Sequence, residues 1–190
     1  ADLLTTVSPT YAREIMEPEY GMGLQDALRA RRSDLVGILN GVDYGEWNPE
    51  TDTLIPHRYS SRQIAGKERN KQELMTNMGL EYSPDRPLFG MVTRLTYQKG
   101  IELLQQVLPG LLADEDFALV ALGSGEPDYE QFFEQLLGEF PDRVAFYRGF
   151  NEALAHRIEA GSDIFLMPSR YEPCGLNQMY SLRYGTVPLV

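Results

Sequence analysis

The second half of the chain alternates short apolar stretches with longer segments in which apolar residues recur at helical spacing. Short apolar runs bounded by turn residues are typical of buried strands, whereas a 3.6-residue period over ten or more residues is typical of helices. Strands separated by helix-sized crossovers predict an α/β fold, a doubly wound, Rossmann-like parallel sheet. The predicted strands are 87–95, 117–122, 144–147, 163–167 and 186–190, and the predicted helices are 99–112, 128–140, 151–160 and 176–184.

The first eighty residues carry a weaker pattern of the same kind. Ser8 followed by Pro9 is a favoured helix start, so a helix is predicted to begin near Pro9 and to end by Met16. The turn residues between 40 and 49 predict a loop. The other predicted elements are a β-forming stretch at 1–7, a short helix within 21–32, a strand at 35–41 and a helix at 67–80 closed by Gly79.

Composition narrows the class of function. The 190 residues include 28 acidic and 17 basic residues, and the net charge of −11 argues against a nucleic-acid partner because it repels polyanions. No run approaches the roughly 18 apolar residues of a membrane span. The single Cys174 cannot form an internal disulfide, which fits a reducing compartment. Only His57 and His156 are present, and we predict no metal site from them.

Polar loops follow the predicted strands, and the carboxyl ends of parallel strands are where ligands bind in such sheets. Arg94 ends one strand and Lys99 begins a helix, an arrangement suited to a pyrophosphate, although a solvent-exposed pair is equally compatible with this spacing. The fragment 123–125 (GSG) lacks the third glycine of a dinucleotide fingerprint and favours an ordinary tight turn. Residue type alone favours a core position for Phe150 and a solvated loop position for Glu172.

The segment after the strand at 163–167 carries the most specific motif. Residues 168–188 read PSRYEPCGLNQMYSLRYGTVP. Cys174 has no histidine or aspartate partner and is not expected to be a nucleophile. Tyr180 and Tyr184 are predicted to be helix packing residues. This run resembles the C-terminal signature of bacterial glycogen synthases and plant starch synthases, which are retaining glucosyltransferases of the two-domain GT-B architecture.

The resemblance implies a domain organisation. Residues 1–45 would end the N-terminal lobe and the inter-lobe segment, 46–80 would form a linker and a helix, and 81–190 would form the nucleotide-sugar-binding C-terminal lobe, with the hinge near residues 40 to 60. The family has an N-terminal domain before this segment and a Thr-Gly-Gly-Leu loop after it. We therefore expect a piece of a longer enzyme, inactive alone, with an uncovered apolar sheet edge at its C-terminus.

The resemblance also implies residue roles in glucosyl transfer from ADP-glucose to the non-reducing end of an α-1,4-glucan. Arg94 and Lys99 would hold the donor phosphates, Gly149 and Phe150 would border the adenine, and Glu172 would contact the transferred glucose. Backbone N–H groups at the start of the last helix would reach sugar hydroxyls and the distal phosphate. These come from Cys174, Gly175, Leu176 and Asn177.

Several alternatives remain at this point. Another GT-B transferase using a UDP- or GDP-sugar, or a non-catalytic nucleotide-sugar-binding module, would share much of this pattern. A Rossmann dehydrogenase is disfavoured because no complete fingerprint occurs. No cofactor is expected beyond the donor substrate. A bacterial member of the family would be cytoplasmic, and a plant member would lie in the plastid stroma.

Overall fold

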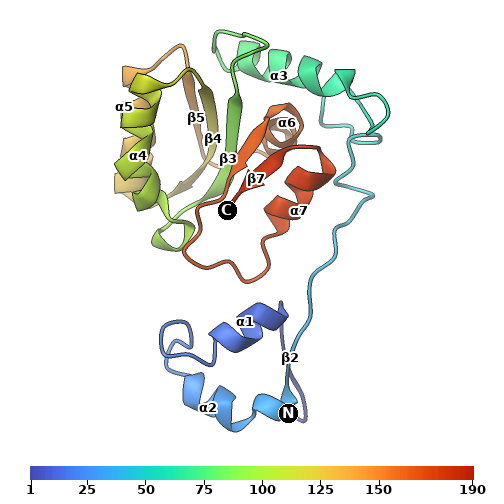
Figure 1. The fold of residues 1–190 in the computed structure, drawn as a ribbon, viewed down its shortest axis with the longest axis vertical. Helices are drawn as coiled ribbons and strands as arrows, with labels where there is room; N and C mark the ends of the chain where they lie inside the picture. The colour runs from blue at the N-terminus through green and yellow to red at the C-terminus, as the bar shows by residue number, and fades with distance from the viewer. The chain divides into compact units, whose positions relative to one another are not determined.

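The computed structural model describes residues 1–190, which divide into two compact units (Figure 1). Unit 1 comprises Ala1–Val42 and Tyr171–Leu176, and unit 2 comprises Asp43–Arg170 and Asn177–Val190. The chain therefore changes unit after Val42, in the predicted loop, and returns briefly to unit 1 through the segment that contains Glu172. None of the helices is both long and apolar enough to cross a membrane.

Unit 1 is built on a two-stranded parallel sheet. Strands β1 (Leu4–Thr6) and β2 (Leu35–Gly37) pair in register, and between them lie α1 (Pro9–Glu14), α2 (Gln25–Ala30) and the 3₁₀ turn η1 (Arg32–Asp34). The predicted helix start is confirmed, because the Ser8 side chain accepts a hydrogen bond from the Tyr11 N–H at 2.8 Å.

Unit 2 confirms the predicted doubly wound parallel sheet. Its five strands lie in the order β5-β4-β3-β6-β7, and every neighbouring pair is parallel. Each predicted strand and helix of this half is present, with boundaries shifted by a few residues. The strands are β3 (Leu88–Leu95), β4 (Ala118–Gly125), β5 (Val144–Arg148), β6 (Ile164–Leu166) and β7 (Val187–Leu189). The helices are α3 (Ala65–Asn77), the 3₁₀ turn η2 (Tyr97–Lys99), α4 (Ile101–Asp114), α5 (Pro127–Glu139), α6 (Glu152–Gly161) and α7 (Leu176–Arg183).

Two apolar layers hold the helices on opposite faces of this sheet. Side chains alternate along β4, so Leu119 and Ala121 pack with α4 and α5 while Val120 and Leu122 pack with α3 and α6. Figure 1 shows α4 and α5 on one side of the strands and α3 and α6 on the other. Burial on both faces explains why these strands read as continuous apolar runs.

The interpretation of residues 123–125 as a tight turn is wrong. These residues continue β4, with Gly123 paired to Thr93 and Gly125 paired to Leu95 of β3. A Cβ atom at either glycine would lie 2.1 Å from a backbone oxygen of β3, so glycine is needed for the close approach of the two strands. The strand therefore reaches further toward the carboxyl edge of the sheet than the apolar run suggested.

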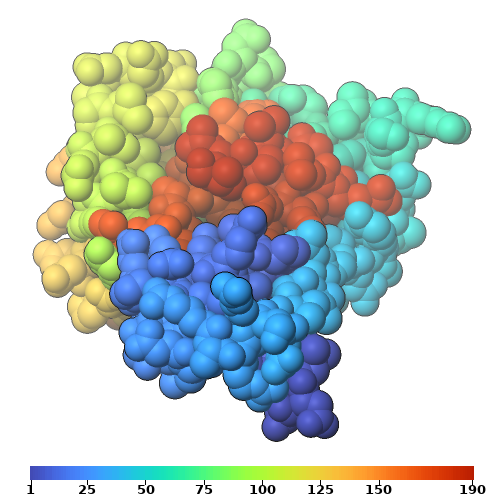
Figure 2. Space-filling view, turned by 60° about the horizontal axis from the view of Figure 1, so that its bottom comes forward, coloured from blue at the N-terminus to red at the C-terminus, as the bar shows by residue number.

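The segment after Val42 packs against the C-terminal helix within unit 2. Tyr184 is fully buried and donates its hydroxyl to Asp52 at 2.5 Å, while Trp47 stacks on Tyr180 with ring centroids 4.1 Å apart. Figure 2 shows this cyan segment bordering the red C-terminal residues. The prediction that Tyr180 and Tyr184 are packing residues is confirmed.

Candidate functional site

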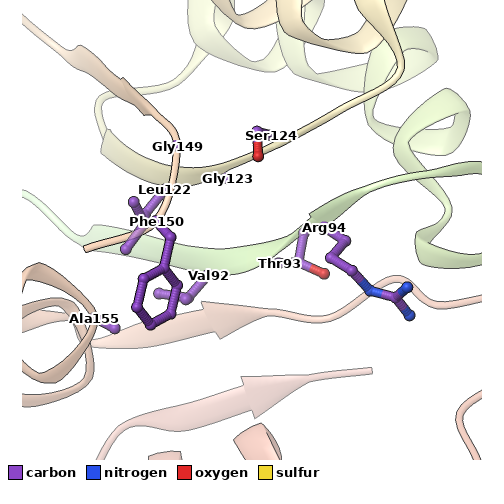
Figure 3. A pocket seen from close by; sticks show the side chains of 9 residues that line it. All are labelled: Val92, Thr93, Arg94, Leu122, Gly123, Ser124, Gly149, Phe150 and Ala155. Carbon is purple, nitrogen blue, oxygen red and sulfur yellow. The ribbon is translucent and has the colours of Figure 1, made fainter. Parts of the chain in front are cut away.

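A pocket of about 260 Å³ lies at the carboxyl end of the three strands β3, β4 and β5. Its wall combines backbone from the strand ends with the first turn of α6. Figure 3 shows the Phe150 ring at one end of this pocket and the Arg94 guanidinium at the other. The lining residues are Val92, Thr93, Arg94, Leu122, Gly123, Ser124, Gly149, Phe150 and Ala155.

Phe150 is not a core residue, so the expectation from residue type is wrong. Its side chain is 87% exposed, because β5 ends at Arg148 and Gly149 then turns the chain with φ of +131°, a value that disfavours residues with a Cβ atom. The Gly149 N–H donates to the Gly123 carbonyl at 3.0 Å, which fixes the turn on the end of β4. An exposed aromatic ring thus stands at a pocket mouth rather than inside the fold.

Arg94 is an exposed cation at the other end of the pocket. Its guanidinium has no acidic partner, in contrast to Arg148, whose guanidinium lies 2.7 Å from the Glu130 carboxylate. Glu130 is itself buried and accepts the Gly125 N–H at 2.9 Å, so its charge is directed to the end of β4 and to Arg148. Arg94 is therefore available to an anion that enters the pocket.

Lys99 lies at the start of the next helix. It ends the turn η2, and Gly100 precedes α4 with φ of +66°. A Cβ atom on Gly100 would lie 1.9 Å from the Pro168 carbonyl oxygen, so the loops after β3 and β6 meet at this glycine. Lys99 is thereby held near the N-terminus of a 14-residue helix, whose dipole favours anions.

Arg170 stabilises the loop that follows β6, a role that was not predicted from the sequence. Its backbone N–H donates to the Gln98 carbonyl at 2.9 Å, its side chain pairs with Glu102 of α4, and its guanidinium lies 4.2 Å from the centre of the Tyr97 ring. The signal in the sequence was weak, because the two charges are 68 positions apart. Arg170 thus stabilises the loops around Lys99.

The remaining predicted site residues follow this loop. Glu172, Cys174, Gly175 and Leu176 belong to unit 1, in which Gly175 is buried with φ of +73°. Asn177 belongs to unit 2, and its side-chain amide donates to the Val92 carbonyl at 2.9 Å, which ties the first turn of α7 to β3. The structure thus brings Arg94, Gly149 and Phe150 to one pocket, and the roles of the segment 172–176 stay predictions.

A polar network in unit 2 connects α3 and α6 to α7 and to the residue before β7. Glu159 is 2% exposed and accepts the Ser181 hydroxyl at 2.8 Å, and burial raises the pKa of its carboxyl to about 8. Lys67 donates to Thr186 Oγ1 at 2.7 Å, and burial lowers the pKa of its amine to about 8. The network places two titratable groups next to the C-terminal helix, so their protonation bears on stability.

Comparison with known proteins identifies the family. The family model described as "Glycosyl transferases group 1" matches residues 79–190, more than half of the chain. The chain belongs to the group 1 glycosyl transferases. A second model, described as "Starch synthase catalytic domain", matches residues 1–30 of this group 1 glycosyl transferase.

Curated relatives of this group 1 glycosyl transferase are glycogen synthases. The chain is 58% identical to the glycogen synthase of Anaeromyxobacter dehalogenans (strain 2CP-C) and 55% identical to that of Myxococcus xanthus (strain DK1622), in each case over the whole chain. It spans 40% and 39% of the length of these two relatives. The resemblance found in the motif at 168–188 is therefore confirmed over all 190 residues.

Solved structures agree with the assignment. The catalytic domain of starch synthase IV from Arabidopsis thaliana, bound to ADP and acarbose, matches with a TM-score of 0.92 and 40% identity, covering 99% of this chain and 39% of that one. The C-terminal domain of the group 1 glycosyl transferase LpcC from Francisella tularensis matches with a TM-score of 0.53 and 18% identity, covering 78% and 69%. The second match supports the fold alone, and both agree with the GT-B lobe expected from the sequence.

Proposed function

We propose that this chain carries the nucleotide-sugar-binding part of a glycogen or starch synthase. The whole enzyme would transfer glucose from ADP-glucose to the non-reducing end of an α-1,4-glucan with retention of configuration. The names of the relatives and the ADP bound to starch synthase IV support this assignment. The observation that carries it is the pocket at the strand ends, which pairs an unpaired cation with an exposed aromatic ring.

The proposed donor site divides into three parts. Phe150 and Gly149 border the adenine, because a base can stack on an exposed ring beside a residue without a side chain. Arg94, Lys99 and the N-terminus of α4 hold the diphosphate through charge-assisted hydrogen bonds. By resemblance, Glu172 positions the transferred glucose, with backbone N–H groups of Cys174, Gly175, Leu176 and Asn177. The Asn177 side chain is already bonded to Val92, so we assign only its backbone to the ligand.

The proposed catalytic role of the site rests on the negative charge that the leaving diphosphate gains during glucosyl transfer. Breaking the glycosidic bond to the donor places negative charge on the leaving diphosphate, and fixed cations that face it lower the barrier. Arg94 suits this task because no carboxylate of the protein neutralises it. Glu172 is a positioning and electrostatic group in this proposal. No step in it uses a metal ion or another cofactor.

The proposed function also assigns a role to each segment of the chain and a cellular compartment to the whole enzyme. Residues 1–45 would complete the N-terminal lobe and the inter-lobe segment, 46–80 would connect the lobes, and 81–190 would form the donor lobe. An enzyme of the kind found in these bacterial relatives would act in the cytoplasm, and a plant enzyme would act in the plastid stroma.

Calorimetry with ADP tests the donor site on this chain. Arg94→Ala is expected to weaken ADP binding by about 1.5–3 kcal/mol, the range for a hydrogen bond to a charged group, which corresponds to about tenfold or more. Arg62→Ala is the matched control, because Arg62 is an exposed arginine of the same unit outside the pocket. Equal losses in both variants would show that the effect is a general one of charge and would remove Arg94 from the site.

Glu172→Gln separates sugar positioning from phosphate binding. If the carboxylate contacts only glucose hydroxyls, ADP affinity stays within about a factor of two, whereas in the whole enzyme kcat falls far more than KM rises. Full activity of this variant would remove Glu172 from the mechanism. A loss of ADP affinity as large as that of Arg94→Ala would contradict the proposed division of roles.

A further inference from the structure

A second cluster of side chains in unit 2 has no role in the proposed transfer reaction. Glu46, Glu152 and His156 each offer one potential ligand atom, and these three atoms lie within 4.8 Å of one another. Glu152 is the first residue of α6 and His156 follows one turn later, so both lie on the same face of that helix. Glu46 comes from the turn at 43–47, where the backbone N–H groups of Glu46 and Trp47 both donate to the Asp43 carbonyl.

His156 supplies the observation that points to a ligand. The side chain is 1% exposed, and its Nε2 atom is buried without a hydrogen-bond partner. The other ring nitrogen, Nδ1, lies 2.8 Å from the Asp52 carboxylate, and Trp47 stacks on the ring with centroids 3.8 Å apart. Leaving such a polar atom unpaired is costly, so Nε2 calls for a partner.

The contacts of Asp52 and Trp47 with the His156 ring favour Nε2 as a metal ligand. A proton on Nδ1 would be donated to Asp52, which leaves the lone pair of a neutral imidazole on Nε2. At metal sites, the ring nitrogen that does not bind the metal usually donates its proton to a carboxylate, which fixes both the tautomer and the ring orientation. Trp47 adds a second restraint on the ring plane.

The types of ligand atom in this cluster indicate which ion it would bind. One imidazole nitrogen and two carboxylate oxygens are ligands of zinc and similar divalent transition metals, and three protein ligands leave a position for water. The two carboxylates also supply the negative charge that offsets a divalent cation. We infer that Glu46, Glu152 and His156 form a binding site for a divalent cation of the zinc class, with Asp52 as the positioning carboxylate.

A cation at this site would have a definite structural effect. It would link the turn at 43–47 to the first turns of α6, two segments joined at present by the stacking of Trp47 on His156. The sequence prediction of no metal site counted only histidines. The carboxylates of Glu46 and Glu152 come to His156 through the fold, which residue counts cannot show.

Titration of the metal-free chain with Zn²⁺ tests the inference. Calorimetry is expected to show one bound ion, and Glu46→Gln and Glu152→Gln are each expected to weaken it by about tenfold or more, since loss of even a supporting partner costs 10- to 100-fold. Both glutamates are exposed, so these substitutions leave the core intact. Zn²⁺ should also raise the melting temperature of the original chain, as any ligand of the folded state does.

Two control variants distinguish this site from others. Glu50→Gln removes an exposed carboxylate from the same segment and should leave Zn²⁺ binding unchanged. Glu73→Gln disrupts the pair of His57 Nε2 and Glu73 at 3.2 Å, which is the other place where a histidine meets a carboxylate, and should also have no effect. Nitrogen NMR of the His156 ring should show a Zn²⁺-dependent change at Nε2 and none at the His57 ring.

Three binding results would overturn the inference. These are the absence of saturable Zn²⁺ binding, binding that persists unchanged in both Glu46→Gln and Glu152→Gln, and binding that is lost in Glu73→Gln. A His156 spectrum that shows a doubly protonated ring and no response to Zn²⁺ would assign Nε2 to a proton shared with the carboxylates instead.

Discussion

Replacing Glu159 by glutamine should remove a pH dependence of stability that arises from one buried carboxyl group. Glu159 is 2% exposed, and its folded-state pKa of about 8 exceeds the ordinary value of 4.5 chiefly because burial disfavours the charged form. The hydrogen bond from Ser181 and the charge of Lys67 offset this burial only in part. Glutamine keeps the shape of the side chain and an acceptor for the Ser181 hydroxyl, but it cannot ionise.

The raised pKa of Glu159 determines the direction and the size of the change in unfolding free energy with pH. A raised pKa means that the folded state holds the proton more tightly, so the contribution of Glu159 to stability is complete below pH 4.5 and is lost as the pH rises toward 8. Each pH unit in this window costs about 1.4 kcal/mol of unfolding free energy. Between about pH 5 and about pH 7.5, below the pKa of Lys67, the loss amounts to about 3 kcal/mol.

Denaturant unfolding at a series of pH values measures this effect. The free energy of unfolding of the original chain, minus that of Glu159→Gln, should fall steadily across the window, since titrating groups that do not interact with Glu159 cancel in this difference. Glu139→Gln, an exposed substitution at the end of α5, controls for the loss of a carboxylate. A Glu159→Gln difference that does not change with pH would refute the reasoning that burial holds this carboxyl neutral.

Three further predictions test other parts of the structure. Gly100→Ala should lower stability by about 1–3 kcal/mol in thermal unfolding, because residue 100 has a positive φ and the new Cβ would lie 1.9 Å from the Pro168 oxygen. Gly110→Ala is the control and should not lower stability, since the space around Gly110 in α4 is open. Tyr184→Phe should cost about 1–3 kcal/mol in chemical unfolding, since Asp52 loses a buried donor; an unchanged midpoint would contradict this. Phe150→Ala should change stability by less than about 0.5 kcal/mol yet weaken ADP binding about tenfold in calorimetry, and unchanged affinity would remove the ring from the base site.

The sequence predicted the fold well because the sheet of unit 2 is buried on both faces. Its strands are continuous apolar runs and its helices keep their 3.6-residue period, so local pattern and tertiary structure agree. The GSG stretch was misread because glycine weakens a strand in general, whereas here it permits the close pairing of β3 and β4. That requirement is imposed by a neighbouring strand and leaves no local signature.

Prediction of the site was more limited, since it depends on contacts between distant residues. Arg94 was singled out from its place at a strand end, and the structure shows it exposed at the pocket. Residue type alone favoured a core position for Phe150, whereas the resemblance placed it beside the adenine; the turn at Gly149 explains why the ring is exposed. The contacts of Arg170 with Glu102 and of His156 with Asp52 join positions 68 and 104 residues apart, beyond the reach of pattern reasoning.

Glucosyl transfer by a complete enzyme is the measurement that decides whether this chain is part of an ADP-glucose-dependent glucan synthase. The 190 residues can replace the aligned segment of the Anaeromyxobacter dehalogenans glycogen synthase, to which they are 58% identical over their whole length. This chimaera is expected to incorporate labelled glucose from ADP-glucose into an α-1,4-glucan, and Arg94→Ala is expected to abolish most of the incorporation. A folded chimaera that prefers UDP-glucose or GDP-glucose, or that binds ADP-glucose without transferring glucose, would contradict this expectation.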